Sequence, residues 1–199
     1  MKMRRVVLAS GNPGKLAEFS ELLEDSGLEL IAPGTLGIAD AEETASTFVE
    51  NALLKARHAS LASGLPAIAD DSGLCVDALE GAPGLYSARY AGPGADAAAN
   101  MARLLSALAG VPEDERTAHF RCCIVLLRHA GDPAPLLCEG TWHGRILEAP
   151  RGSGGFGYDP LFLDPLLDAT AAELEPAAKH CVSHRGAALA QLRRQLALL

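Results

Sequence analysis

Two adjacent carboxylates, Asp70 and Asp71, follow a short apolar run over residues 65–69 that is typical of a buried strand. Ser72 and Gly73 come next, and the pattern predicts that the strand ends here and that the backbone turns at Gly73. Carboxylate oxygens at a strand end suit a hard cation such as Mg²⁺, which keeps several waters. A carboxylate beside such an ion can also accept a proton from water. The alternative is an ordinary turn, because the same residue types dominate turns.

A second candidate is the sequence Ser-Gly-Asn-Pro-Gly-Lys at residues 10–15, between a predicted strand and a predicted helix. Unpaired backbone N–H groups at a helix start, together with a lysine, form an anion site. The segment is not a Walker A loop, because Gly11 and Gly14 are too close and no Ser or Thr follows the lysine. The alternative is a capped helix with a solvated lysine.

A third candidate is the glycine-rich loop, whose residues 152–157 match G-x-G-x-x-G by letters. A dinucleotide fingerprint must open a helix after a strand, and the following Tyr158-Asp159-Pro160 does not suit a helix start. We therefore reject the dinucleotide interpretation. A loop that carries an exposed aromatic side chain and an aspartate can instead stack on a base and hydrogen-bond to it. The alternative is a plain surface loop.

Basic side chains gather at the last predicted helix start, where His184 and Arg185 follow Ser183 and Lys179 lies nearby. Such a helix start suits an anion or another polar ligand. The alternative is a capped helix whose basic residues are exposed.

The elements that must position these residues follow from the pattern of apolar and capping residues. Asn12 is a natural N-cap, and Thr47 to Glu50 form a capping box. In the helix that this box opens, Asn51 and Lys55 share one face, which either lines a cleft or lies on the surface. Strands are predicted over residues 5–9, 28–32, 65–69, 117–128, 136–146 and 161–163, and helices over 13–26, 48–63, 97–109, 171–175 and 185–198. Strands alternate with helices in the first part of the chain, and an antiparallel hairpin follows. This order predicts an α/β fold with a mixed central sheet flanked by helices.

Composition limits the function classes. The chain has 199 residues, of which 49% are hydrophobic and 21% charged, and we expect a single domain over residues 1–199. The net charge of −8 disfavours binding to nucleic acid or to an anionic membrane. No apolar run reaches the length of a membrane span, and the start of the chain lacks a signal-peptide pattern. The five cysteines show no CxxC motif, so we expect free thiols in a reducing cytoplasm.

Taken together, these motifs resemble those of the inosine/xanthosine triphosphate pyrophosphatases, also called the HAM1 family. The matching stretches occur in order along nearly the whole chain: residues 10–15, 42–44, 48–56, 69–74, 81–90, 154–160 and 183–189. One departure lies in residues 173–179, where Ala177 and Ala178 replace residues that are often acidic in the family.

The resemblance implies the activity, the cofactor and the roles of the site residues. The activity is Mg²⁺-dependent hydrolysis of non-standard purine nucleoside triphosphates (ITP, dITP and XTP) to the monophosphate and pyrophosphate. Asp71 is the expected proton acceptor and, with Glu43, a metal ligand. The residues expected to hold the triphosphate are Ser10, Gly11, Asn12, Pro13, Gly14, Lys15, Lys55 and Ser72. The residues expected to hold the base and sugar are Phe156, Gly157, Tyr158 and Asp159. Those expected to complete the recognition of the base and the phosphates are Lys179, His184 and Arg185.

The family is also expected to form homodimers, with the active site in a cleft between two lobes. Four basic groups and a metal ion suit a polyanionic substrate in an otherwise acidic chain. Selectivity is expected to come from the 6-oxo group of the base. That group accepts a hydrogen bond where the amino group of adenine donates one, and such a mismatch costs about 1–3 kcal/mol.

Three other interpretations remain open at this stage. One is a related nucleotide pyrophosphatase that acts on a modified pyrimidine or a methylated nucleotide. Another is a nucleotide sensor that binds without hydrolysis. The third is a nucleic-acid-binding module, which the negative charge disfavours.

Overall fold

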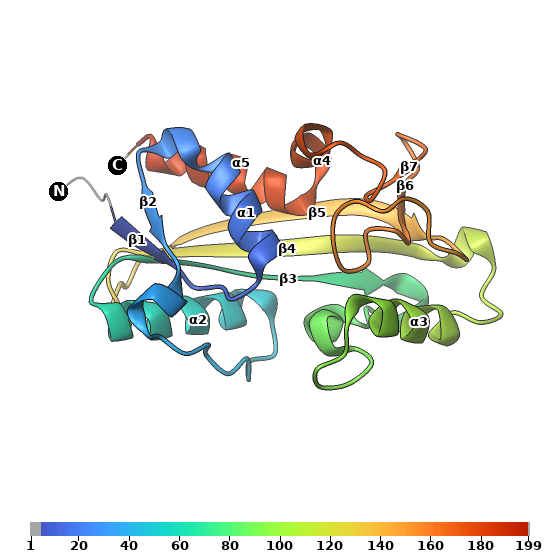
Figure 1. The fold of residues 1–199 in the computed structure, drawn as a ribbon, viewed down its shortest axis with the longest axis horizontal. Coiled ribbons are helices and arrows are strands. Elements are labelled where there is room, and N and C mark those ends of the chain that lie inside the picture. Colours follow the sequence, from blue (N-terminus) through green and yellow to red (C-terminus); the bar gives the residue numbers. More distant parts are fainter. Residues whose placement is uncertain (1–4, 199) are drawn as a thin grey trace. The chain divides into compact units, whose positions relative to one another are not determined.

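The computed structural model describes residues 5–198 and contains one mixed, seven-stranded sheet in the order β2-β1-β3-β4-β5-β6-β7 (Figure 1). Strand β1 pairs in parallel with β2 and β3, while β6 pairs antiparallel with β5 and β7. The strands are β1 Arg5–Leu8, β2 Glu29–Ile31, β3 Ala67–Val76, β4 Thr117–Leu127, β5 Leu136–Ile146, β6 Phe162–Asp164 and β7 Ala169–Thr170. The predicted α/β class with a mixed sheet is confirmed.

The chain divides into two compact units, and β3, β4 and β5 each contribute residues to both. The first unit contains the chain up to Asp71, the segment Cys122–Gly140, and the chain from Arg185 onward. The second unit contains Ser72–Arg121 and Thr141–His184.

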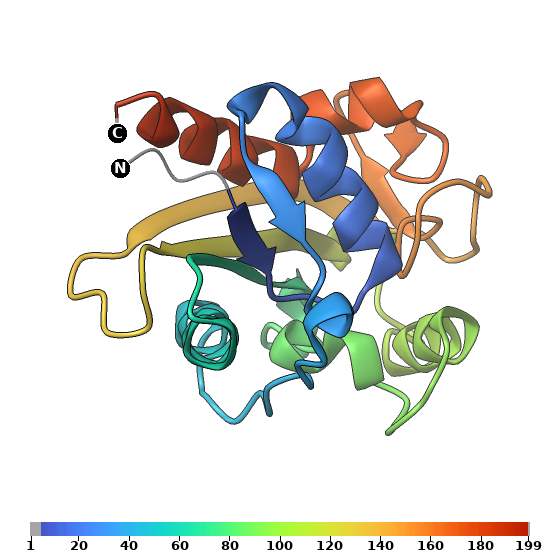
Figure 2. The same cartoon turned by 60° about the vertical axis from the view of Figure 1, so that its left-hand side comes forward.

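In the first unit, helices cover both faces of the strands (Figure 2). Helices α1 (Pro13–Leu22) and α5 (His184–Leu196) lie on one face, where Phe19 and Leu189 share an apolar cluster with Ile68. Helix α2 (Phe48–Ser63) lies on the other face, where its alanines pack on β1, β3 and β4. Small side chains on α2 therefore allow the helix to lie close to the strands.

The second unit has its own core, built around aromatic side chains. Trp142, Phe120 and Phe162 pack together with ring centroids 4.6–6.4 Å apart. Helices α3 (Ala97–Ala107) and α4 (Pro176–Val182) belong to this unit, and Leu104 of α3 joins the same cluster. Trp142 also donates from Nε1 to Asp164 Oδ2 at 2.8 Å, which satisfies its buried polar atom.

The helix starts follow the predicted capping rules. Asn12 caps α1 by accepting a hydrogen bond from the backbone of Lys15, and Thr47 caps α2 by accepting one from Glu50. Asp96 caps α3 in the same way. Gly64 ends α2 in the left-handed conformation that glycine adopts without strain. These caps fix where the two helices that carry Lys15 and Lys55 begin.

Two local predictions are wrong. The strand does not end at Asp71, because β3 continues through Gly73 to Val76 without a turn. A glycine is required there because an added Cβ would lie 2.2 Å from the carbonyl oxygen of Gly84. The helix predicted over residues 171–175 is absent, since Thr170 pairs in β7 and the helix begins only at Pro176. The glycine-rich loop contains no helix, in agreement with the rejected dinucleotide motif.

The turn between β4 and β5 joins neighbouring strands, and residues 128–135 are too few for the crossover that parallel strands need. The predicted antiparallel hairpin therefore holds. Asp132 organises this turn: its buried carboxylate accepts hydrogen bonds from the backbone and guanidinium of Arg128 and from the backbone of Ala134.

Two predicted absences can be compared with the described residues. Within residues 5–198, no helix has both the length and the hydrophobicity that a membrane crossing requires. The five cysteines, all of which lie in the described part of the chain, form no disulfide.

Candidate active site

The first unit contains a buried cluster of charges around Asp70, whose side chain has no exposed surface. Lys15 Nζ lies 2.8 Å from Asp70 Oδ2, and Arg185 Nη2 lies 3.6 Å from the same oxygen. Glu18 of α1 forms a second ion pair with Arg185 through Nη1. One buried carboxylate thus joins the start of α1 to the start of α5.

Asp70 is ionised in this environment. Burial alone would raise the pKa of its carboxyl, but the charges of Lys15, Arg185 and Lys55 outweigh burial and hold that pKa well below its usual range. The same carboxylate raises the pKa of Arg185 despite the burial of the guanidinium. The two cations are therefore held in place by a permanent negative charge.

A second group of charges surrounds Asp71, the next residue of β3. Lys55 Nζ lies 2.9 Å from Asp71 Oδ1 and 2.9 Å from Glu43 Oε1. Asn51 donates from Nδ2 to Asp71 Oδ2 at 3.2 Å and accepts from the backbone of Ala45 at 3.0 Å. Asp71 is thus fixed at both oxygens, and Asn51 also anchors the loop that carries Glu43.

Asp71 and Asp70 differ in their proton affinity. Burial raises the pKa of Asp71, Glu43 adds to that effect, and the nearby Lys55 does not fully offset it. For Lys55 itself, burial lowers the pKa, but Asp71, Asp70 and Glu43 outweigh it, so the net effect is a raised pKa. A carboxylate with a raised pKa is the better proton acceptor of an adjacent pair.

The predicted anion loop lies at the start of α1. Ser10 Oγ accepts from the backbone of Asn12 at 3.3 Å, and Gly14 is in the first turn of the helix that begins at Pro13. Gly11 lies against Asp40, so that an added Cβ would be 2.9 Å from the Asp40 carboxylate. The exposed backbone at Gly11 therefore lies close to one carboxylate, and Lys15 extends from the helix start toward Asp70.

In the second unit, the glycine-rich loop is held by a lysine–aspartate pair. Lys179 Nζ of α4 lies 2.6 Å from Asp159 Oδ2, and the same oxygen accepts from the backbone of Phe156 at 2.8 Å. The ammonium also lies 5.1 Å from the centre of the Phe156 ring, within cation–π distance. Phe156 is 37% exposed and leaves an aromatic surface available for stacking.

Of the other predicted residues in the second unit, Tyr158 and His184 are buried, while Gly157 and Ser72 are half-buried. Tyr158 is 5% exposed and donates its hydroxyl to the backbone oxygen of Ser87 at 2.8 Å. His184 stacks on Phe120 with ring centroids 4.8 Å apart and an interplanar angle of 12°. Gly157 has a positive φ of 63°, and Ser72 follows Asp71 directly in β3.

The structure decides two of the alternatives that the sequence left open. Asn51 and Lys55 point to the Asp71 carboxylate and do not form a solvated helix face. His184 and Arg185 are buried, so the interpretation as exposed basic residues is wrong.

The structure places three residues in the cluster that had been given no site role: Asp70, Asn51 and Glu18. Asp70 was a candidate from its position next to Asp71 and Asn51 from its spacing to Lys55, but neither signal showed which charged partner the side chain contacts. Glu18 follows Lys15 by three residues on one helix face, which is a weak signal by itself.

The donor set around Asp71 fits magnesium. Glu43 and Asp71 each direct one oxygen to the Lys55 ammonium, so the two carboxylates can reach a single cation. Carboxylate oxygens are ligands that Mg²⁺ prefers, and two of them are enough because this ion keeps several waters. Residues 5–198 contain no group of three His, Cys, Asp or Glu side chains arranged for a metal, so waters and substrate oxygens would complete the coordination.

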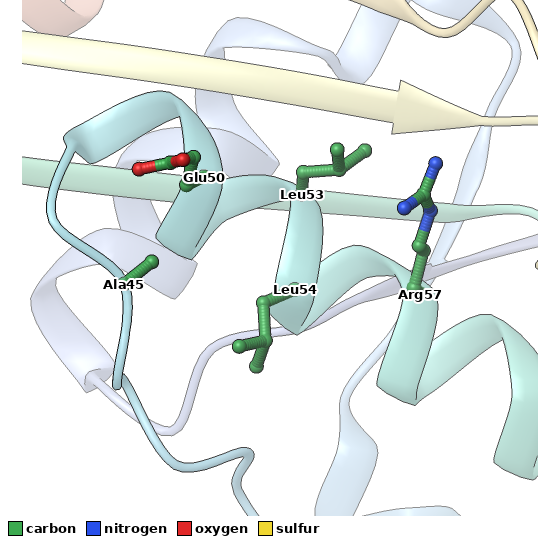
Figure 3. A pocket seen from close by; sticks show the side chains of 5 residues that line it. All are labelled: Ala45, Glu50, Leu53, Leu54 and Arg57. Carbon is green, nitrogen blue, oxygen red and sulfur yellow. The ribbon is translucent and has the colours of Figure 1, made fainter.

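A hollow of about 390 Å³ lies beside α2 and is not part of this cluster (Figure 3). Its lining consists of Ala45, Glu50, Leu53, Leu54 and Arg57. Two leucines between one acidic and one basic side chain do not suit a polyanion, and none of the predicted site residues contributes to this lining.

These features define a class of protein: an α/β protein with a mixed sheet, in which basic side chains from its helices lie beside two adjacent carboxylates at a strand. The particular family follows from comparison, because the family model described as the Ham1 family matches residues 6–195. The chain belongs to the Ham1 family.

Individual relatives match this chain in sequence over nearly their whole length. The chain is 60% identical over 200 residues to a dITP/XTP pyrophosphatase of Ralstonia nicotianae and 59% identical over 194 residues to one of Xanthomonas campestris, covering 98% of each chain. The solved HAM1 protein of Coxiella burnetii is 50% identical, with a TM-score of 0.92 over 99% of this chain and 100% of that one. The Staphylococcus aureus Ham1 protein is 40% identical, with a TM-score of 0.86 and 98% of both chains covered.

Proposed function

We propose that this protein hydrolyses non-standard purine nucleoside triphosphates, namely ITP, dITP and XTP, to the nucleoside monophosphate and pyrophosphate. The observation that carries the proposal is the Asp70–Asp71 pair: one carboxylate fixes Lys15 and Arg185, and the next is a poised proton acceptor. The names of the relatives with about 59% identity support the same substrates.

The phosphates of the substrate bind to the three cations of the first unit. Lys15 extends from a helix start whose backbone N–H groups favour anions, and Lys55 and Arg185 add two further donors. Because Asp70 holds Lys15 and Arg185 in place before the substrate arrives, these two side chains need little ordering on binding.

Asp71 takes the proton of the attacking water. The water oxygen forms a bond to the α-phosphorus, the bond from that phosphorus to the bridging oxygen breaks, and pyrophosphate leaves. Asn51 keeps the Asp71 carboxylate oriented through Oδ2. Lys15 and Arg185 neutralise the charge that develops on the phosphate oxygens.

Charge balance supports the need for a divalent ion. The cluster contains three cations, Lys15, Lys55 and Arg185, against four carboxylates, those of Glu18, Glu43, Asp70 and Asp71. It therefore has no positive excess for a polyanion. Magnesium held by Glu43 and Asp71 would supply that charge and would lower the pKa of water in its coordination shell.

The glycine-rich loop of the second unit recognises the base. Phe156 offers a stacking surface, Lys179 and Asp159 hold the loop, and backbone donors meet the 6-oxo group of hypoxanthine or xanthine. Gly157, Tyr158 and His184 belong to the same recognition region. We further propose that the chain is one domain, works as a homodimer and acts in the cytoplasm.

The test is pyrophosphate release from ITP, dITP, XTP, ATP, GTP and dTTP, with magnesium and with a chelator. We expect turnover of the first three nucleotides, poor turnover of ATP, and loss of activity with chelator. Asp71→Asn should lower the rate on ITP by about 10²–10⁴-fold while substrate binding persists. The exposed Asp114→Asn serves as the matched control. Absence of pyrophosphate from all three non-standard nucleotides overturns the proposal.

A further inference from the structure

Lys55 occupies the place between the two proposed magnesium ligands. Its ammonium lies 2.9 Å from Asp71 Oδ1 and 2.9 Å from Glu43 Oε1, so it uses one oxygen of each carboxylate. The three side chains are 12%, 8% and 27% exposed, respectively, so the cluster is largely shielded from water. Without an ammonium between them, two carboxylates at this separation would repel each other.

A lysine ammonium and a magnesium ion cannot share these oxygens in the same geometry. Both are cations, and they would repel each other at a distance at which each contacts the same carboxylates. Lysine has a flexible four-carbon stem, and its three N–H donors suit phosphate as well as carboxylate. Asn51 stays on Asp71 Oδ2, so Asp71 keeps its orientation when the lysine leaves.

We propose that Lys55 is the internal counter-ion of the metal-free site, that magnesium displaces it from Glu43 and Asp71, and that the displaced ammonium then binds the nucleotide phosphates. The identities of the metal and the nucleotide rest on the proposed function. The displacement makes magnesium binding weak without nucleotide. Because the phosphates give the ammonium a new partner, nucleotide and metal increase each other's affinity by the same factor.

The first test measures metal binding without nucleotide, by titration with Mn²⁺ followed by electron paramagnetic resonance and with Mg²⁺ by calorimetry. Lys55→Met removes the ammonium and keeps the length of the side chain, so the affinity for metal should rise about tenfold or more. Arg57→Met is the matched control, because it removes one positive charge from the exposed side of the same helix (Figure 3). This variant should change the affinity by about twofold at most.

Three results overturn the inference: unchanged or weaker binding by Lys55→Met, an equal rise in Arg57→Met, or no metal binding by either the wild type or Lys55→Met. Pyrophosphate release from ITP is measured on the wild type in parallel. If the wild type fails to hydrolyse ITP but Lys55→Met binds metal more tightly, the proposed function fails and the counter-ion role stands. If the wild type hydrolyses ITP but Lys55→Met binds metal no more tightly, the counter-ion role fails and the proposed function stands.

A second measurement uses the unmodified sequence, in case Lys55→Met does not fold. The chain has four lysines, so lysine-selective ¹⁵N labelling gives at most four ammonium signals by nuclear magnetic resonance. Lys55→Arg identifies the signal of Lys55 by its absence. Saturating Mg²⁺ without nucleotide should shift that signal and accelerate its proton exchange, because its carboxylate partners are lost. An unchanged Lys55 signal at saturating Mg²⁺ overturns the inference.

Discussion

Lysine is rare in this chain, and three of its four lysines each contact an aspartate. Lys15 pairs with Asp70, Lys55 with Asp71, and Lys179 with Asp159; of these six side chains, Lys15 is the most exposed, at 15%. A buried cation without a partner would be strongly unfavourable, so each carboxylate makes its lysine possible at that position. The cations that we assign to the substrate are thus held in place by the fold itself.

Asp70→Asn tests this dependence at the level of one residue. The substitution keeps the volume but removes the charge that Lys15 and Arg185 share, so the free energy of unfolding should fall by about 3 kcal/mol. Urea denaturation measures the change. Asp114→Asn, in the exposed 3-10 helix Glu113–Glu115, should alter the free energy by less than about 0.5 kcal/mol. Equal small losses in both variants would contradict the assigned role of Asp70.

Residue types and local spacing were enough to single out Lys15 and Asp71 as candidates, whereas Lys55 was given a site role only through the family resemblance. They were not enough for the Asp70–Arg185 contact, because the two residues are separated by most of the chain and meet only through the fold. Glu18 was missed for the same reason, since its partner Arg185 lies far away in the sequence, on the last helix.

At the scale of elements, the starts of the helices could be predicted because a cap is a local device. Asn12, Thr47 and Asp96 each accept a hydrogen bond from a residue three positions later, which the sequence displays directly. Strand ends are different, since they depend on what packs against them. The sequence near Gly73 has the composition of a turn, yet the structure extends β3 through it.

Gly73→Ala tests why β3 needs a glycine. The added Cβ would lie 2.2 Å from the Gly84 carbonyl oxygen and 2.7 Å from Ser87 Oγ. That hydroxyl oxygen accepts a hydrogen bond from the backbone N–H of Leu74. We expect a loss of about 1–3 kcal/mol in the free energy of unfolding, measured by urea denaturation. Gly34→Ala, where nothing lies within 4 Å of the added atom, is the control and should be close to neutral. A neutral Gly73→Ala would contradict the packing argument.

Asp132→Asn tests the turn between β4 and β5. The hydrogen bonds of Arg128 hold the pKa of Asp132 well below its usual range, although burial acts against them. The unfolded chain therefore binds the proton more tightly, and the carboxylate stabilises the fold above its unfolded pKa of about 4. The variant should lose about 1–2 kcal/mol at pH 7, and the difference from wild type should shrink as the pH falls below about 4.

Denaturation at pH 7, 5 and 3 measures that trend. The Arg128 side chain is 50% exposed, so solvent moderates the ion pair and the expected loss stays small. A difference between the two proteins that grows toward low pH would contradict the assigned ionisation of Asp132.

For the whole molecule, each unit has its own apolar core, yet three strands pass from one unit into the other. We predict that the chain unfolds in one cooperative transition, because melting a shared strand removes hydrogen bonds from both units. Trp142 fluorescence reports on the second unit. Thiol labelling of the buried Cys122 and Cys138 reports on the first.

The two probes should give the same midpoint in urea. Burial raises the pKa of Cys138 to about 11, so labelling of this thiol in the folded protein at neutral pH is slow and its exposure on unfolding dominates its signal. Two separate midpoints would show that the units unfold independently and would contradict the assignment of the chain as one domain.

The interleaved path of the chain also bears on how such a protein can change during evolution. The first unit takes its residues from the beginning, the middle and the end of the sequence. Any single crossover between two genes of this family, at a point between Asp71 and Arg185, therefore gives the first unit mixed parentage. Its core then has to combine side chains from two ancestors, so complementary substitutions at facing positions must be inherited together or be lost.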